Sequence, residues 1–211
     1  MRIALIHALR HSPPPIEAAF DALWPEARRM NLLDDSLSAD LARDGALTPA
    51  MTDRFLTLAR YAVGTGANGI LFTCSAFGPC IDAVKAEFPA IPVLKPNEAM
   101  IEDAMARGRR IGLMATFAPT LASMQAEFPP DAVLVKTHVD GGLAALDRGD
   151  GATHDRLAAE AASALTDCDV VALAQFSMAR AAEAVAQASG RPVLTTPESA
   201  VRKLRRLLLG A

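Results

Sequence analysis

The sequence predicts an α/β protein built from two pseudo-symmetric, doubly wound parallel-sheet halves, related by internal duplication, with the site between them. Short apolar runs alternate along the chain with alanine-rich stretches of helical period, which is typical of βαβ units. The apolar runs are continuous rather than alternating, as expected for strands that are covered on both faces. Segments of the first half also recur, in the same order, in the second half.

In the first half, runs of apolar and β-branched residues predict strands, and the amphipathic stretches between them predict helices. The strands are expected at Arg2–Ala8, Arg29–Leu33, Gly69–Thr73 and Pro92–Leu94. The helices include Thr48–Thr65 and Pro79–Phe88. The second of these begins with a proline, which is favoured in the first turn of a helix.

The second half repeats this pattern. Its strands are expected at Arg110–Thr116, Ala132–Lys136, Asp169–Ala174 and Pro192–Thr195. Its helices include Asn97–Arg107, His154–Leu165, Ala179–Ser189 and Pro197–Leu209. The last of these has an amphipathic pattern with a solvated basic face.

The internal repeat sets the domain organisation. The matched pairs are RIALIHA (Arg2–Ala8) with RIGLMAT (Arg110–Thr116), GILFTCSAF (Gly69–Phe77) with VVALAQFSM (Val170–Met178), and PVLKPNEAM (Pro92–Met100) with PVLTTPESA (Pro192–Ala200). Each pair is separated by about 100 residues, so the chain is expected to hold two halves of similar size. We place the first half at residues 1–96, with the C-terminal helix as an optional completion, and the second at residues 97–211.

The composition narrows the classes of function. The 211 residues carry a net charge of −3, which argues against binding to nucleic acid. No apolar run approaches the ~20 residues of a membrane span, so no membrane association is expected. The 3 cysteines fit neither a disulfide framework nor a zinc site, which indicates a reducing, cytoplasmic compartment and no metal. No glycine-rich phosphate loop follows a strand, so a nucleotide cofactor is not expected.

Ligands of open parallel sheets bind beyond the carboxyl ends of the strands, so the residues just after each strand are the candidates. They are His7, Asp34, Asp35, Cys74, Ser75 and Lys95 to Asn97 in the first half, and Thr116, Thr137, His138, Gln175 to Ser177, Thr195 and Thr196 in the second. This polar set carries little net charge and suits a small polar ligand.

Cys74 is the most informative of these residues. It ends a buried strand and precedes a helix, so backbone N–H groups and the positive end of the helix dipole should lower the pKa of its thiol. The alternative is a buried structural thiol, which is what we expect for Cys80 and Cys168. Asp34 either caps the next segment or orients a basic partner, and capping is the preferred interpretation. His154, like His11, is expected at the surface.

The motif TCSAF after a strand, with LAQFS at the corresponding place in the second half, resembles the aspartate/glutamate racemase superfamily. RIGLMATFAPTLAS, PVLKPNEAM and PVLTTPESAV extend the resemblance over nearly the whole chain. The superfamily includes cofactor-independent racemases of aspartate, glutamate and hydantoins, maleate isomerases and arylmalonate decarboxylases. The resemblance implies a PLP-independent, racemase-like isomerase in amino acid metabolism. It would act on a small carboxylic or amino acid without a cofactor, as a monomer or a homodimer.

By similarity, Cys74 is the first of the two cysteines with which the family's racemases exchange the α-proton. The second falls at Gln175, which cannot exchange a proton, and His7 stands where glutamate racemases have an acidic residue. Three alternatives remain. His138 would supply the missing acid/base group, Ser177 would deliver a proton through water, or the enzyme needs only one thiol, as a decarboxylase or as an isomerase with a nucleophilic cysteine does.

The resemblance also suggests how substrate is held. Ser75 and Thr116 resemble residues that contact a substrate carboxylate, and together with neighbouring amides such as that of Ala76 they would stabilise an enediolate. The alternative is that both hydroxyls cap helices. We therefore predict Cys74 and His138 as catalytic. The predicted substrate-binding residues are His7, Ser75, Ala76, Thr116, Gln175 and Ser177. The alternative functions are a one-thiol lyase of a malonate-like acid and a non-catalytic binding protein for small acids.

Overall fold

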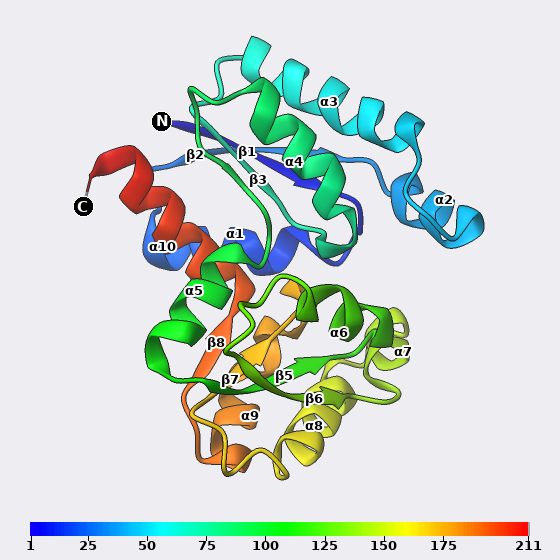
Figure 1. Ribbon diagram of the computed structural model, residues 1–211, viewed down its shortest axis with the longest axis vertical. Coiled ribbons are helices and arrows are strands. Elements are labelled where there is room, and N and C mark those ends of the chain that lie inside the picture. Colours follow the sequence, from blue (N-terminus) through cyan, green and yellow to red (C-terminus); the bar gives the residue numbers. More distant parts are fainter. Residues whose placement is uncertain (211) are drawn as a thin grey trace. The chain divides into compact units, whose positions relative to one another are not determined.

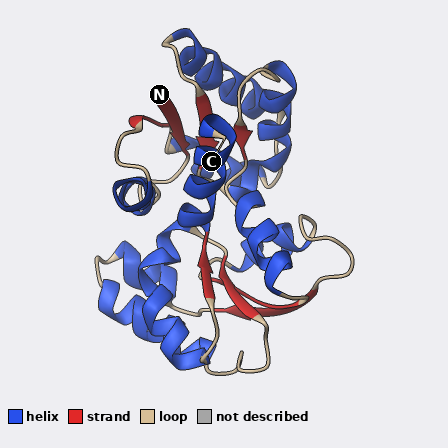
Figure 2. Cartoon of the chain, turned by 90° about the vertical axis from the view of Figure 1, so that its left-hand side faces the viewer, coloured by secondary structure: helices blue, strands red, loops and turns tan. Residues whose placement is uncertain are grey.

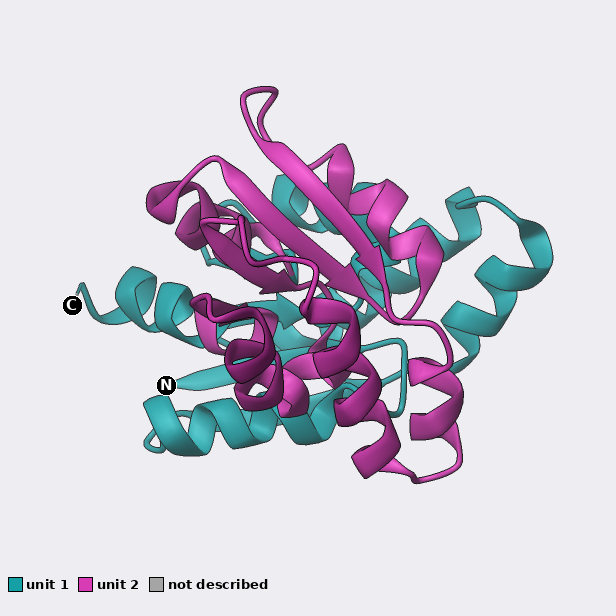
Figure 3. Cartoon of the chain, turned by 90° about the horizontal axis from the view of Figure 1, so that it is seen from below, with its two compact units in different colours: residues 1–96, 200–211 teal, residues 97–199 magenta. Residues whose placement is uncertain are grey.

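The structure is a computed structural model that describes residues 1–210 (Figure 1). The chain divides into two compact units, one formed by residues 1–96 and 200–211 and the other by residues 97–199 (Figure 3). Each unit holds one four-stranded sheet in which every strand pair is parallel. Helices flank the strands in both units (Figure 2). The predicted α/β class with two parallel sheets is therefore confirmed.

The first sheet has the strand order β2-β1-β3-β4. Its unit comprises β1 (Arg2–His7), α1 (Pro13–Leu23), β2 (Arg28–Leu33), α2 (Ser36–Asp44), α3 (Pro49–Gly64), β3 (Gly69–Phe72), the 3-10 helix η1 (Ser75–Phe77), α4 (Gly78–Glu87) and β4 (Val93–Leu94). The part of α10 (Thr196–Leu209) from residue 200 onward also belongs to this unit.

The first sheet is covered on both faces, which explains its continuous apolar strands. On one face, Ile6 and Phe72 pack in a cluster with Phe55 of α3 and Phe77 of η1. The ring of Phe55 lies 5.2 Å from that of Phe72 and 5.0 Å from that of Phe77. On the other face α10 approaches so closely that a Cβ on Gly69 would lie 3.2 Å from a side-chain carbon of Leu204. Glycine at that position lets the helix pack directly against the strand.

The second sheet has the corresponding order, β6-β5-β7-β8. Its unit comprises α5 (Glu98–Arg107), β5 (Arg110–Ala115), α6 (Ala118–Gln125), β6 (Val133–His138), α7 (Gly142–Asp147), α8 (Gly151–Ala162), β7 (Val170–Leu173), the 3-10 helix η2 (Phe176–Ala181), α9 (Ala182–Ser189) and β8 (Val193–Thr195).

Two separate clusters cover the faces of this sheet. Leu113 of β5 packs with residues of α5 and α6 such as Met100 and Leu121, whereas Leu173 of β7 packs with α8 and α9. Parallel strands whose two faces are both buried contain apolar residues at successive positions, as the burial of β7 shows.

All eight predicted strands are present, and each bound lies within two residues of its prediction. Strand β6 extends to His138, so this residue ends a strand instead of following one. Four further helices, α1, α2, α6 and α7, lie outside the helical ranges named from the sequence. The expectation that His154 lies at the surface is wrong: its side chain is fully buried where α8 packs. None of the helices in residues 1–210 is long and apolar enough to cross a membrane.

Candidate functional site

Cys74 stands at the carboxyl end of the first sheet. Strand β3 ends at Phe72, and Cys74 is still extended, with φ −126° and ψ 117°, before the chain turns into η1 and α4. Pro79 lies in the first turn of α4, as its position in the sequence predicts. The strand and the short helical segments therefore fix the thiol at an edge where parallel sheets bind ligands.

Three uncharged features act on the Cys74 thiol. The side chain is half-buried against the apolar cluster that contains Leu37. Hydrogen bonding from the backbone N–H of Ala76 and the hydroxyl of Ser38 acts to lower the pKa of the thiol. Burial outweighs both of these hydrogen bonds and raises the pKa of Cys74 above its ordinary value. The expected lowering of this pKa is therefore wrong, although the predicted backbone donor is present. The raised pKa favours the protonated thiol.

His7 lies at the end of β1 and is almost completely buried. Its Nε2 is 2.8 Å from Oδ1 of Asn31, and its Nδ1 is 2.8 Å from the hydroxyl of Thr73. The Asn31 amide nitrogen donates to Glu17, which assigns Asn31 Oδ1 as the acceptor and His7 Nε2 as the donor. Burial is the largest influence on the pKa of His7 and lowers it. Because both ring nitrogens are engaged inside the protein, the predicted contact of His7 with substrate stays a prediction.

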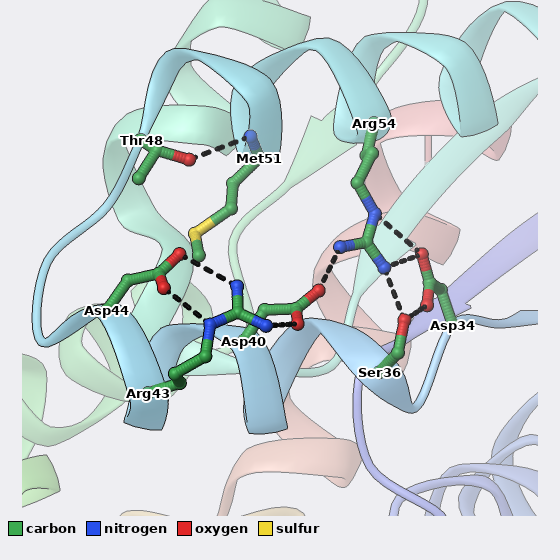
Figure 4. Close-up of polar contacts among 8 residues, drawn as sticks. All are labelled: Asp34, Ser36, Asp40, Arg43, Asp44, Thr48, Met51 and Arg54. Atoms are coloured by element: carbon green, nitrogen blue, oxygen red, sulfur yellow. Dashed lines mark hydrogen bonds and ion pairs between the residues drawn. The ribbon is translucent and has the colours of Figure 1, made fainter.

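An ion-pair network fixes the start of α2 to α3 (Figure 4). Arg54 of α3 donates to the carboxylate of Asp34, to the carboxylate of Asp40 at 2.6 Å and to the hydroxyl of Ser36 at 2.6 Å. Burial works against ionisation of Asp34, but the hydrogen bonds from Arg54 and Ser36 prevail and lower its pKa. The N-cap residue of α2 is Asp35, and it makes no side-chain capping bond. Asp34 therefore orients a basic partner, and its carboxylate also interacts with Ser36, the first residue of α2.

In the second unit, Gln175 occupies the place after β7 that Cys74 occupies after β3. Its side-chain oxygen accepts hydrogen bonds from the Thr116 backbone N–H at 2.7 Å, the Thr116 hydroxyl at 3.0 Å and the Phe117 backbone N–H at 3.2 Å. Three donors thus converge on one oxygen just before α6. Thr116 does not cap α6, because its hydroxyl is used by Gln175. The role of Thr116 in binding substrate stays a prediction.

His138 lies beside this arrangement. It pairs with Ala115 in the register of β5 and β6, and its Nε2 is 3.3 Å from the carbonyl oxygen of Thr116. A carbonyl only accepts, so this contact places the proton of the neutral ring on Nε2 and leaves the Nδ1 lone pair for a base. The second unit therefore brings together three of the predicted residues, His138, Thr116 and Gln175.

The other predicted site residues lie in the segments that follow Cys74 and Gln175. Ser75 is half-buried and Ala76 is exposed in the turn after Cys74, whereas Ser177 is half-buried in η2 after Gln175. Cys80 and Cys168 are fully buried in apolar clusters, as expected for packing residues. Within residues 1–210, no group of three or more His, Cys, Asp or Glu side chains is placed to hold a metal ion.

Two further polar residues, Ser38 and Lys95, received no specific role from the sequence. Ser38 lies in α2, far from Cys74 along the chain, and no local motif signals its effect on the pKa of the thiol. Lys95 directly follows β4, and its Nζ lies 2.8 Å from a carboxylate oxygen of Asp82 and 3.9 Å from the point that a Cβ on Gly78 would occupy. It places a cation at the start of α4. The sequence feature that could have identified Lys95 is its position directly after a strand.

Comparisons with known proteins agree with this architecture. Among curated proteins, no sequence is significantly similar to the chain. The structure is similar to allantoin racemase from Klebsiella pneumoniae, with a TM-score of 0.75, 20% identity, and coverage of 100% of this chain and 89% of that one. It is similar to glutamate racemase from Francisella tularensis, with a TM-score of 0.73, 17% identity, and coverage of 99% and 81%. It is also similar to arylmalonate decarboxylase, with a TM-score of 0.71, 20% identity, and coverage of 100% and 94%.

These structural similarities establish the fold, and a sequence comparison establishes the family. A model of the Asp/Glu/hydantoin racemase family matches residues 13–204, which is most of the chain. The chain therefore belongs to the Asp/Glu/hydantoin racemase family.

Proposed function

We propose that the protein is a cofactor-independent isomerase that transfers a proton at a carbon next to a carboxylate, with Cys74 as the essential thiol. The observation that carries this proposal is the placement of a protonated Cys74 thiol at the carboxyl end of β3. There, the Ala76 N–H and the Ser38 hydroxyl act to lower the pKa of the thiol, against the effect of burial. Proton donation leaves a thiolate, and these two groups would stabilise its charge without any charged neighbour.

We propose His138 as the second acid/base group. Gln175 carries no exchangeable acid/base proton, and its oxygen is held by Thr116 and Phe117. The contact of His138 Nε2 with the Thr116 carbonyl assigns Nε2 as the donor, so Nδ1 is the nitrogen that would accept a proton. In this mechanism Nδ1 removes the α-proton and the bond electrons move into the carboxylate to form an enediolate. The Cys74 thiol then gives its proton to the opposite face of the carbon.

The proposed substrate class follows from the hydrogen-bond donors near Cys74 that could bind a carboxylate. We propose a small carboxylic or amino acid whose carboxylate accepts hydrogen bonds from the Ser75 hydroxyl and backbone amides of the turn after Cys74. Donors of this type favour the enediolate over the ground state because they meet the larger negative charge that develops on the carboxylate.

A second candidate is decarboxylation of a malonate-like acid. One observation favours it, namely the burial that keeps the Cys74 thiol protonated. Loss of carbon dioxide leaves an enediolate without any base, so the reaction needs a single proton donor. Cys74 would then act alone, and His138 would not be required.

Exchange of α-protons in deuterated water, followed by proton NMR, tests the proposal. A panel of amino acids, hydantoins and substituted malonates is incubated with the wild type, Cys74→Ser and His138→Gln. The isomerase proposal predicts exchange with inversion in the wild type and its loss in Cys74→Ser. In His138→Gln, inversion should fall by about 10²-fold or more.

The variants separate the candidate functions. Release of carbon dioxide from a malonate that requires Cys74 and is unaffected by His138→Gln would establish the lyase instead. Binding of an acid without turnover, by wild type and Cys74→Ser alike, would contradict both catalytic proposals and support a binding protein.

A further inference from the structure

The amino edge of the first sheet holds an open pocket with a volume of about 400 Å³. Its lining comes from the starts of β1 and β2 and from the turn between α3 and β3. The lining residues are Met1, Arg2, Arg28, Thr65, Gly66 and Asn68. Cys74 lies beyond the other end of β3, at about 3.3 Å for each residue of extended chain. The pocket is therefore separate from the edge where the proposed reaction takes place.

Backbone contacts join these segments and engage carbonyl groups of the lining. The Met1 carbonyl accepts a hydrogen bond from the Arg28 N–H at 2.9 Å, and the Arg2 carbonyl accepts one from the Asn68 N–H at 2.8 Å. The Thr65 carbonyl, at the end of α3, accepts from the Arg2 guanidinium. Three acceptors of the lining are thus already bound to donors of the protein.

The side-chain donors of the pocket are in the opposite situation. Oδ1 of Asn68 accepts from the Arg2 N–H at 2.8 Å, which leaves Nδ2 of the same amide as a donor. Within residues 1–210, neither this Nδ2 nor the Arg28 guanidinium has a hydrogen-bond or ion-pair partner, and none of the lining residues is acidic. Arg2 adds a second guanidinium, whose Nη1 donates to Thr65. The pocket therefore combines two positive charges with unused N–H donors.

A surplus of charged donors favours an anion as the ligand. A guanidinium presents parallel N–H groups that match the oxygens of a phosphate or a carboxylate. A phosphate monoester carries about −1.5 to −2 charges at neutral pH and offers three acceptor oxygens, which suits two arginines and one amide. The pocket volume falls in the range of small-molecule sites, about 300–1,000 Å³, so it has room for the organic part of such a molecule as well.

We propose that this pocket binds the phosphate group of a small organic phosphate, with Arg2, Arg28 and the Asn68 amide as the donors. The protein as a whole carries a net charge of −3, so the attraction for this anion comes from the local arginines. The site is additional to the proposed catalytic site, and its ligand is not the substrate of the proposed reaction.

Isothermal titration calorimetry on the full chain tests the site without any substrate, with ribose 5-phosphate and glycerol 3-phosphate as probes. The wild type should bind at least one of them, whereas ribose and glycerol should give no heat of binding. Arg28→Gln should weaken binding by about tenfold or more, because it removes hydrogen bonds between charged groups. Arg28→Lys keeps the charge and should lose less affinity. Added sodium chloride should weaken binding to the wild type, since it screens exposed charges.

Three comparisons locate the ligand. Arg148→Gln removes an exposed arginine of the second unit and should bind the probes as the wild type does. Cys74→Ser should also keep the wild-type affinity, because the pocket lies at the opposite edge of the sheet. NMR of the backbone amides should show shifts at Gly66 and Asn68 on addition of the phosphate. Succinate, whose two charges lie on separate groups, should bind more weakly than the phosphates.

Affinity that is unchanged in folded Arg28→Gln, or the absence of binding of both phosphates to the wild type, would overturn the proposal. Loss of binding in Cys74→Ser would place the ligand at the catalytic edge and would also contradict it. Succinate that binds as tightly as the phosphates would contradict the choice of a phosphate. Failure of the proposed isomerase reaction is a separate result, because these titrations contain no substrate and do not require Cys74.

Discussion

The side-chain oxygen of Gln175 lies 2.7 Å from the backbone nitrogen of Thr116 and accepts its hydrogen bond. The same oxygen accepts from the Thr116 hydroxyl and from the Phe117 N–H. The residue that replaces the second family cysteine is therefore an internal acceptor. It binds the carboxyl end of β5 to the start of η2 without carrying a proton for the reaction.

Replacement of Gln175 by alanine should lower the free energy of unfolding by about 1–3 kcal/mol. The N–H of Thr116 is part of a buried residue and loses its acceptor, and leaving a buried donor unpaired costs about this much. Urea unfolding followed by circular dichroism measures the change. Gln187→Ala is the matched control, because that glutamine donates to the exposed Glu183 side chain, at 3.3 Å. Equal stability of the two variants would contradict the structural role of Gln175.

His7 should make the stability of the protein depend on pH. Its folded-state pKa lies below the ordinary value of 6.5, so the unfolded chain binds the proton first as the pH falls. The stability that neutral His7 contributes is fully present above pH 6.5 and is lost as the pH falls below it. Between pH 7.5 and 5.5 this one group should cost up to about 1 kcal/mol.

Urea unfolding at these two pH values checks the His7 prediction. His7→Gln cannot take up the proton, so its stability should fall less over this range than that of the wild type. His11→Gln changes an exposed histidine and should behave as the wild type does. The same loss of stability in His7→Gln and the wild type would show that His7 does not cause the pH dependence.

Gly142 at the start of α7 leaves space for the side chain of Thr116. A Cβ at this position would lie 2.8 Å from the Thr116 methyl carbon, a distance that forces Thr116 to move. Gly142→Ala should therefore disturb the contacts of Thr116 with Gln175 and His138 and reduce inversion of substrate by about tenfold or more. Gly64→Ala, whose Cβ meets nothing within 4 Å, is the control and should leave activity unchanged. The rate of substrate inversion is measured for both folded variants. Equal rates in Gly142→Ala and Gly64→Ala would show that the position of Thr116 does not affect activity.

The fold could be predicted because its determinants are local. The apolar run before Cys74 and the proline at position 79 are sufficient to indicate a strand followed by a helix. The repeat of this pattern in the second half indicates a second sheet of the same order. Consistent local signals of this kind are what allow a sequence to specify its strands and helices.

The electrostatics of the site could not be predicted because they depend on distant residues. The pKa of Cys74 is raised by burial in a cluster that includes Leu37 of α2, and no feature of the TCSAF motif reveals that contact. The pairing of Asp34 with Arg54 has no local signal, because Arg54 lies 20 residues further along the chain. The sequence around His154 predicts a surface position, although the packing of α8 buries its side chain. In each case tertiary packing outweighs the local pattern.

The measurement that tests the central claim most directly compares wild type, Cys74→Ala and Cys80→Ala in the α-proton exchange assay. Cys80 follows Cys74 closely in the sequence but is fully buried and packs in the core, so it controls for the loss of a thiol. We predict that Cys74→Ala lowers the exchange rate by about 10³-fold and that folded Cys80→Ala keeps most of it. Exchange by Cys74→Ala at the wild-type rate would contradict the assignment of Cys74 as the essential thiol.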